Sequence, residues 1–150
     1  MNKAEIRVMT INDYSEVHAL WSKTSGVGLN EMDDSKSGIA KYLARNPLTC
    51  FVAEMSGEIV GAVLGGHDGR RGTICHLAVA HDQRGQGIGT ALVDATIATL
   101  KHEGIRKIWL VVMNDNMQGN DFWEKQGFTL RDDIGYRDKA IIGERKVYIC

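Results

Sequence analysis

The stretch "HDQRGQGIGTAL", His81 to Leu92, carries glycines at three alternate positions, Gly85, Gly87 and Gly89, directly before an apolar helical pattern. The first N–H groups of a helix have no partner within the helix, and they carry the positive end of its dipole. Glycines let a ligand approach the backbone closely, and Arg84 adds a charged donor that suits phosphate oxygens. The stretch therefore predicts an anion site at the start of a helix, best suited to phosphate.

Two common phosphate motifs do not fit this stretch. The P-loop needs a lysine followed by serine or threonine after its last glycine, whereas Thr90 follows Gly89 directly. The dinucleotide pattern G-x-G-x-x-G fails because the third glycine comes one residue early, and because the motif follows the fourth expected strand rather than the first. The spacing thus excludes the nucleoside-triphosphate and dinucleotide patterns.

Hydrophobic periodicity on both sides predicts one mixed α/β domain over residues 1–150. The expected strands cover residues 4–11, 50–55, 59–64, 72–80, 106–113, 128–131 and 146–150, and the expected helices cover 12–23, 34–46, 87–103 and 116–127. The order is β-α-α-β-β-β-α-β-α-β-β, a central mixed sheet flanked by helices. The nearly all-apolar run 106–113 is typical of a strand buried on both faces.

Charge, apolar runs and cysteines limit the kinds of partner, and the cellular location, that we expect for this protein. A formal net charge of -1 argues against a broad attraction to nucleic acid or to an anionic membrane. No apolar run approaches the roughly 20 residues that span a bilayer, and the first residues lack the apolar core of a secretory signal. Cys50, Cys75 and Cys150 show no C-x-x-C spacing, so we expect no metal site. Free thiols without a signal predict a cytoplasmic protein.

The fuller pattern around the glycines is more specific. Residues 84–89 match R-x-x-G-x-G, and they follow an apolar strand that ends in Leu77-Ala78-Val79. This resembles the acetyl-CoA loop of the GNAT superfamily of N-acetyltransferases, and the expected element order resembles the GNAT fold. A second signature of that family, N-x6-Y-x3-G-F, is similar to the segment from Asn116 to Phe128, with Trp123 at the tyrosine position.

The resemblance implies an acyltransferase, of the kind that transfers groups other than amino-acyl groups. It would pass an acetyl group directly from the thioester of acetyl-CoA to a primary amine, on a small molecule, a protein N-terminus or a lysine. The resemblance implies no metal, and it is compatible with a homodimer. The residues expected to bind acetyl-CoA are Leu77, Ala78, Val79, Arg84, Gly85, Gln86, Gly87, Ile88, Gly89, Thr90 and Asn116. A splay between strands 72–80 and 106–113 would admit the pantetheine arm.

The catalytic residues are less well marked. His76 is the titratable group of suitable pKa on strand 72–80, but strict alternation places it with Ile74 and Ala78, opposite Cys75. The family's bases lie on the Cys75 face, so a bulge would have to re-aim His76. Trp123 can donate a hydrogen bond to the leaving sulfur, but its indole cannot usefully give up a proton, and it can equally be a core residue.

Two further readings stay open from the sequence. The acidic pair Asp33 and Asp34 can meet a cationic substrate, although a solvated acidic loop is the simpler interpretation. A protein that binds CoA as a sensor or interaction module, with weak or lost catalysis, is the alternative to an enzyme, because the family tyrosine and an obvious base are missing.

Overall fold

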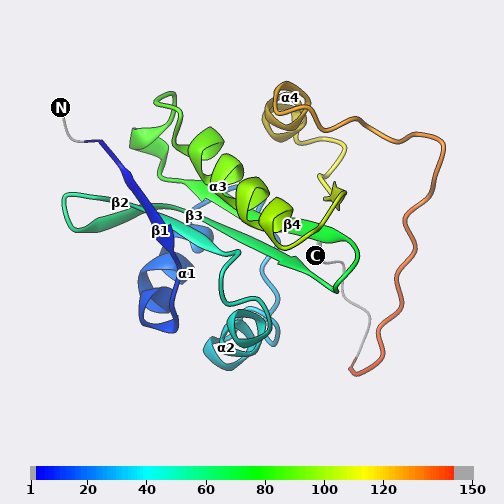
Figure 1. Ribbon diagram of the computed structural model, residues 1–150, viewed down its shortest axis with the longest axis horizontal. Coiled ribbons are helices and arrows are strands. Elements are labelled where there is room, and N and C mark those ends of the chain that lie inside the picture. Colours follow the sequence, from blue (N-terminus) through cyan, green and yellow to red (C-terminus); the bar gives the residue numbers. More distant parts are fainter. Residues whose placement is uncertain (1–2, 144–150) are drawn as a thin grey trace.

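This computed structural model describes residues 3–143. They fold around a mixed five-stranded sheet (Figure 1). The strands lie in the order β1-β2-β3-β4-β5, with antiparallel pairs up to β4 and a parallel pair between β4 and β5. Their bounds are β1 Glu5–Val8, β2 Phe51–Met55, β3 Glu58–His67, β4 Gly72–Val79 and β5 Ile108–Trp109. The predicted mixed sheet is therefore confirmed.

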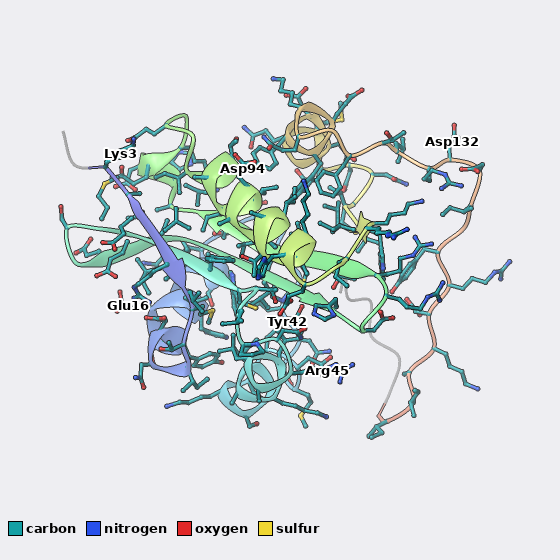
Figure 2. The ribbon with its side chains drawn as sticks, viewed as in Figure 1. Lys3, Glu16, Tyr42, Arg45, Asp94 and Asp132 are labelled. Carbon is teal, nitrogen blue, oxygen red and sulfur yellow. The ribbon has the colours of Figure 1, made fainter. Side chains whose placement is uncertain are left out.

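Among the described residues, four α-helices cover the two faces of the sheet. They are α1 Tyr14–Ser22, α2 Lys36–Arg45, α3 Ile88–His102 and α4 Met117–Lys125. Trp21 of α1 and Ile39 of α2 pack with Val52 and Leu64 on one face, and Leu92 of α3 is buried on the other. Figure 1 shows α1 and α2 on one side of the sheet and α3 on the opposite side. On α3, Asp94 is exposed on the outer surface (Figure 2).

Local sequence explains the boundaries that the predictions placed correctly. Ser56 and Gly57 have φ values of 53° and 81°, so the β2–β3 hairpin turns through two residues with positive φ. The Ser35 hydroxyl accepts a hydrogen bond from Gly38 N–H at 3.1 Å and begins α2. Gly104, with φ 85°, follows the end of α3 and lets the chain turn away.

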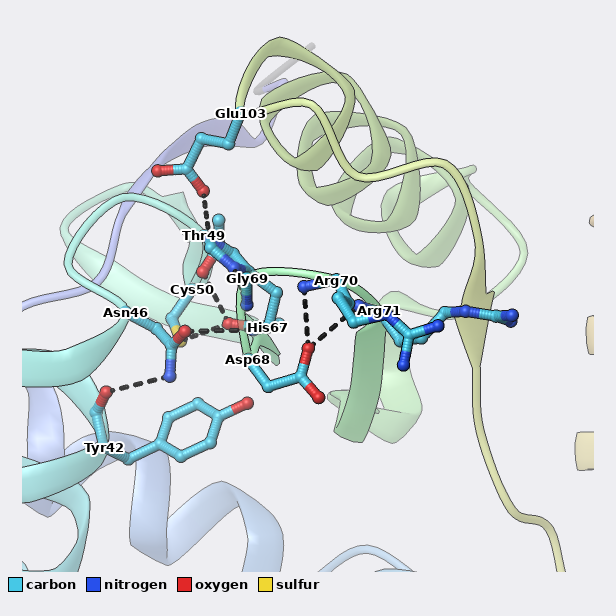
Figure 3. A network of polar contacts seen from close by, with 11 residues as sticks. Tyr42, Asn46, Thr49, Cys50, His67, Asp68, Gly69, Arg70, Arg71 and Glu103 are labelled. Carbon is cyan, nitrogen blue, oxygen red and sulfur yellow. Dashed lines mark hydrogen bonds and ion pairs between the residues drawn. The ribbon is translucent and has the colours of Figure 1, made fainter.

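Side-chain contacts hold the end of the sheet that is remote from the glycine stretch (Figure 3). The Asn46 side chain accepts a hydrogen bond from His67 N–H at 3.0 Å, which joins the end of α2 to β3. The His67 ring lies 2.9 Å from a Glu103 carboxylate oxygen. Asp68 accepts hydrogen bonds from the N–H groups of Arg70 and Arg71 and so closes the turn into β4.

Near the N-terminal end, Arg7 organises a cluster of charges. Its guanidinium donates to both carboxylate oxygens of Asp13 at 2.9 Å and to Glu54 at 2.8 Å. Asp13 also accepts a hydrogen bond from Thr10 N–H at 2.9 Å. These hydrogen bonds, first of all those from Arg7, hold the pKa of the Asp13 carboxyl below its usual range.

The predictions for the C-terminal third were partly wrong. The expected strand 106–113 is paired only at Ile108 and Trp109, and Trp109 is 49% exposed, so it is not buried on both faces. No strand forms over residues 128–131. Phe128 N–H instead donates to Trp123 O at 3.0 Å beyond Gly127, and the Phe128 ring packs on Trp123, which closes the end of α4. The strand expected at 146–150 lies outside the described residues.

Candidate active site

A bulge in β4 determines which side chains face the α1 side of the sheet. Leu64 pairs with Cys75 and Ala62 pairs with Ala78, so two β4 residues lie opposite the single residue Val63. His76, with φ 53°, is one of the two. Cys75 and Ala78 consequently pack on the same face although they are three residues apart.

This bulge corrects the strict alternation expected for the strand. The His76 ring contacts Trp21 of α1, edge to face, at a centroid distance of 5.0 Å, so it lies on the Cys75 side of the sheet rather than opposite to it. Leu77 and Val79 pack on the α3 side. The structure thus contains the bulge that the sequence analysis required if His76 was to lie on the Cys75 side of the sheet.

His76 forms a buried pair with Asp34. The His76 Nε2 atom lies 2.8 Å from Asp34 Oδ1, and the two side chains are only 3% and 6% exposed. The other carboxylate oxygen of Asp34 accepts a hydrogen bond from Asn30 N–H at 2.7 Å, and the Asp34 carbonyl accepts one from the Tyr14 hydroxyl at 2.6 Å. The simpler interpretation of a solvated acidic loop is therefore wrong for Asp34, although Asp33 is exposed.

A cavity of about 590 Å³ passes between β4 and the segment after β5. Pairing of the two strands stops at Thr73 and Trp109, and beyond that point both sides line the cavity. The expected splay of these strands is therefore observed. The lining residues come from within five segments, 24–28, 74–79, 83–90, 110–113 and 116–123. Gln86, which the sequence placed at the acetyl-CoA site, is not among them, and its amide donates to Gln83 at 3.0 Å.

The glycine stretch lies at the start of α3, where the sequence placed it. Gly85 and Gly87 have φ values of 78° and 82°, and a Cβ added at either would meet no heavy atom within 4 Å. Gly87 is the N-cap residue, and a glycine has no side chain that could accept a hydrogen bond from the N–H groups of the first turn. The N–H groups of the first turn are therefore presented to the cavity, in the arrangement that favours an anion.

Arg84 and Thr90 flank these glycines. The Arg84 guanidinium Nε donates to Val79 O at 3.2 Å, which holds the cation at the mouth of the loop. The Thr90 hydroxyl accepts a hydrogen bond from the Gln126 amide at 2.9 Å, a contact between α3 and the end of α4 that the sequence did not indicate. A residue pair 36 positions apart leaves no local signal from which this link could be read.

The remaining predicted residues lie at the α4 side of the cavity. Asn116 lines it, and its Oδ1 accepts a hydrogen bond from Gly119 N–H at 2.9 Å, so the side chain caps α4. Trp123 also lines the cavity, and its ring lies between Phe122 and Phe128 at centroid distances of 5.0 Å and 5.1 Å. Trp123 is therefore both a packing residue and a wall of the cavity.

The sheet, the splay of its strands and the glycine stretch are arranged as expected for an acyltransferase of the GNAT family. The model of the acetyltransferase (GNAT) family matches residues 14–128, and the chain belongs to this family. An acetyltransferase of Sodalis glossinidius is 34% identical over 142 residues, which cover 95% of this chain and 99% of the relative. One of Pectobacterium atrosepticum is 37% identical over 142 residues, with the same coverage of 95% and 99%.

Solved structures share the fold. A predicted acetyltransferase from Clostridium acetobutylicum, solved with acetyl-CoA, has a TM-score of 0.73 at 22% identity, covering 91% of this chain and 96% of its own. Ard1 from Thermoplasma volcanium has a TM-score of 0.71 at 21% identity, covering 85% and 84%.

The described residues contain neither a membrane-crossing helix nor a metal-binding cluster. No helix within residues 3–143 is long and apolar enough to cross a membrane. The same residues contain no group of three or more His, Cys, Asp or Glu side chains that could hold a metal ion.

Proposed function

We propose that this acetyltransferase transfers the acetyl group of acetyl-CoA directly to a primary amine, without a covalent enzyme intermediate. One observation carries the proposal: a single cavity joins the glycine stretch before α3 to the bulge of β4 and the segment 24–28. The acyl donor would enter from the glycine side and the amine from the opposite side. The two would then meet between β4 and residues 110–113.

The glycine side fits the pyrophosphate of CoA. The first-turn N–H groups of α3 and the Arg84 guanidinium supply donors for its oxygens, and the open space at Gly85 and Gly87 leaves room for it. Main-chain groups of β4 beyond Thr73 have no β5 partner, so Leu77, Ala78 and Val79 would bind the pantetheine arm. Asn116 would contact the arm through its Nδ2 atom, because its Oδ1 already caps α4.

The amine side needs a base. A lysine-like amine has a pKa near 10.4, so making it neutral at pH 7 costs roughly 4 to 5 kcal/mol. The described residues that line the cavity include three with titratable side chains, Cys75, His76 and Arg84. Of these, His76 has the side chain that ordinarily accepts a proton near neutral pH. We therefore assign His76 as the general base.

The leaving sulfur needs little help from the protein. The amine loses a second proton after it attacks the thioester, and this proton can pass to the sulfur as the carbon–sulfur bond breaks. Trp123 then has to offer no more than a hydrogen bond from its indole N–H. The tyrosine-to-tryptophan difference is consequently compatible with catalysis.

Calorimetric titration with acetyl-CoA, at two salt concentrations, tests the first half of the proposal. We expect binding that weakens as salt rises, because the ligand is a polyanion held by local donors. An absence of binding at millimolar acetyl-CoA would show that the glycine stretch does not hold CoA.

Release of CoA in the presence of amines tests the second half. The panel should include peptides with N-terminal alanine and aminoglycosides. Two structures of the same fold suggest these acceptors, a ribosomal-protein-alanine N-acetyltransferase from Brucella melitensis and an aminoglycoside acetyltransferase from a soil metagenome. Acetyl-CoA binding without turnover of any amine would support the sensor or interaction module instead.

A further inference from the structure

The end of the cavity where the amine would lie has neutral walls. The α1–α2 segment contributes residues 24–28, which are small and uncharged, and residues 110–113, which also line the cavity, are all apolar. None of the described residues that line the cavity is an aspartate or a glutamate. Arg84, a cation of the lining, lies at the glycine end and is held to Val79 O at 3.2 Å. An ammonium group at the amine end therefore meets no described carboxylate in the wall.

The described carboxylates of the α1–α2 segment lie outside this wall. Asp34 is buried, with its Oδ1 atom 2.8 Å from His76 Nε2, and its other carboxylate oxygen accepts the Asn30 N–H at 2.7 Å. Glu31 and Asp33 are exposed and are not among the lining residues. The acidic pair that the sequence offered to a cationic substrate consequently contributes no carboxylate to the lining.

The α1–α2 segment also narrows the cavity. A Cβ added at Gly26 would lie 2.9 Å from Asn116 Nδ2, so the backbone of the segment runs close to the start of α4. Val27 packs against the core cluster that contains Val17 and Trp21 of α1. A group that enters this end gives up part of its hydration, which disfavours the charged form of an amine where no opposite charge replaces the water. The amine that reaches the thioester should therefore be neutral and should bring no other positive charge with it.

Amines differ greatly in how readily they become neutral. The α-amino group of a polypeptide has an ordinary pKa of about 7.7 to 8.0, whereas a lysine side chain has one of about 10.4. At pH 7 the neutral fraction is therefore roughly one in ten for the α-amine and roughly one in 2,500 for lysine, a difference of about 250-fold. The same ratio holds whether the proton passes to solvent or to His76, because its destination is the same for both amines. Polyamines and aminoglycosides carry further positive charges as well.

We propose that the acceptor is an α-amine next to an amide carbonyl, as at the N-terminus of a polypeptide, on a residue whose side chain is uncharged. The proposal rests on the acetyl transfer proposed above. The α-ammonium gives one proton to the base, and the neutral nitrogen bonds to the thioester carbonyl carbon. The carbon–sulfur bond breaks with its electron pair on the sulfur, and a second amine proton goes to the sulfur, so that the N-acetyl product and CoA leave.

Two peptides of identical composition give the first test. The first, the alanine peptide, has a free N-terminal alanine and one Nε-acetylated lysine, and the second is acetylated at its N-terminus and has a free lysine. We expect the alanine peptide to have a kcat/KM at pH 7 at least about tenfold higher, because the greater nucleophilicity of the more basic lysine amine offsets only part of the difference in neutral fraction. A lysine peptide that reacts equally well or better would overturn the proposal.

Alanine amide carries the same α-amine without a following chain, and so separates the two sources of the proposed group. A kcat/KM close to that of the alanine peptide would assign the site to small amino-acid amides, and a much lower value would assign it to polypeptide N-termini. Spermidine and an aminoglycoside complete the panel, and we expect each to react at least about tenfold less well than the better of the two α-amines. A higher kcat/KM for spermidine or the aminoglycoside would overturn the proposal.

Ser25→Asp tests whether the neutral wall is the cause of the preference. Ser25 is exposed and lines the cavity, so the variant adds a carboxylate to the wall. The probe is the alanine peptide with arginine as its first residue, which adds a positive charge but no second acceptor amine. We expect the kcat/KM of this arginine peptide, relative to that of the alanine peptide, to rise about fivefold in Ser25→Asp, the size of an exposed ion pair.

Ser15→Asp is the matched control for this variant. Ser15 is an exposed residue of α1 that is not among the lining residues, so its replacement adds the same charge outside the cavity and should leave the ratio of the two peptides unchanged. An unchanged ratio in Ser25→Asp, or an equal rise in Ser15→Asp, would show that the charge of the wall does not select the acceptor and would overturn the proposal.

Failure of the proposed function looks different from failure of this inference. If the wild-type protein releases no CoA with any member of the panel, the acetyl transfer itself is wrong and the acceptor class falls with it. If the wild type is active but prefers the lysine peptide, spermidine or the aminoglycoside, acetyl transfer stands and the assignment of an α-amine is refuted.

Discussion

Replacing Gly87 with alanine separates cofactor binding from stability, because the structure supplies a matched control. Gly87 has φ 82° and Gly57, in the remote β2–β3 turn, has φ 81°, and an added Cβ meets no heavy atom within 4 Å at either position. Alanine in the left-handed region costs roughly 1 to 2 kcal/mol, so both variants should lose similar stability. For a domain of this size that is roughly 2 to 8 °C in Tm.

Only Gly87→Ala should weaken acetyl-CoA. Gly87 lines the cavity and is the N-cap of α3, whereas Gly57 is not among the lining residues. A methyl group there would occupy space that the pyrophosphate needs and would displace it from the N–H donors. Losing two charge-assisted hydrogen bonds of about 1.5 kcal/mol each is about 3 kcal/mol, or a rise in Kd of about 100-fold.

Thermal unfolding and calorimetric titration of both variants measure the two effects. The expected result is a similar fall in Tm for Gly87→Ala and Gly57→Ala, with the large loss of affinity confined to the first. If Gly87→Ala bound acetyl-CoA within about threefold of the wild type, our placement of the pyrophosphate would be wrong. An equal loss of affinity in Gly57→Ala would show that the effect comes from general destabilisation.

Three further predictions concern residues at and beyond the cavity. Asn116→Ser should keep the cap on Gly119 N–H, and hence Tm, but weaken acetyl-CoA about tenfold through the lost Nδ2 donor; unchanged affinity in titration would leave Asn116 a capping residue alone. Trp123→Phe should keep the fold, seen by circular dichroism, and lower kcat less than about tenfold; a larger fall would make the indole N–H essential. The hydrogen bonds from Arg7 lower the pKa of Asp13 in the folded protein, so their stabilisation is complete above the unfolded pKa of about 3.9 and is lost as pH falls through the folded value. Urea unfolding should therefore show Asp13→Asn to be less stable than wild type by about 2 kcal/mol near pH 7, with a difference that shrinks as the pH falls below about 3.9, and a difference independent of pH would contradict this.

The sequence determined the local elements of this protein. Turn residues, caps and periodicity placed the β2–β3 hairpin, α2, β4 and α3 within a few residues, because each depends on neighbours in the chain. The glycine stretch is local in the same sense, since Gly85 and Gly87 stand at the start of α3, where the sequence placed them, and adopt a positive φ that glycine tolerates. The local geometry of the glycine stretch could therefore be predicted.

The tertiary structure decided where His76 and Asp34 lie. Whether His76 faces the α1 side depends on one extra residue in the β3–β4 register, and nothing in the alternation of the strand indicates that residue. Asp34 resembles a solvated loop carboxylate in sequence, but it is buried because it meets an imidazole 42 positions away. Burial and pairing of such groups depend on long-range packing, so the contact between His76 and Asp34 becomes visible only once the chain is folded.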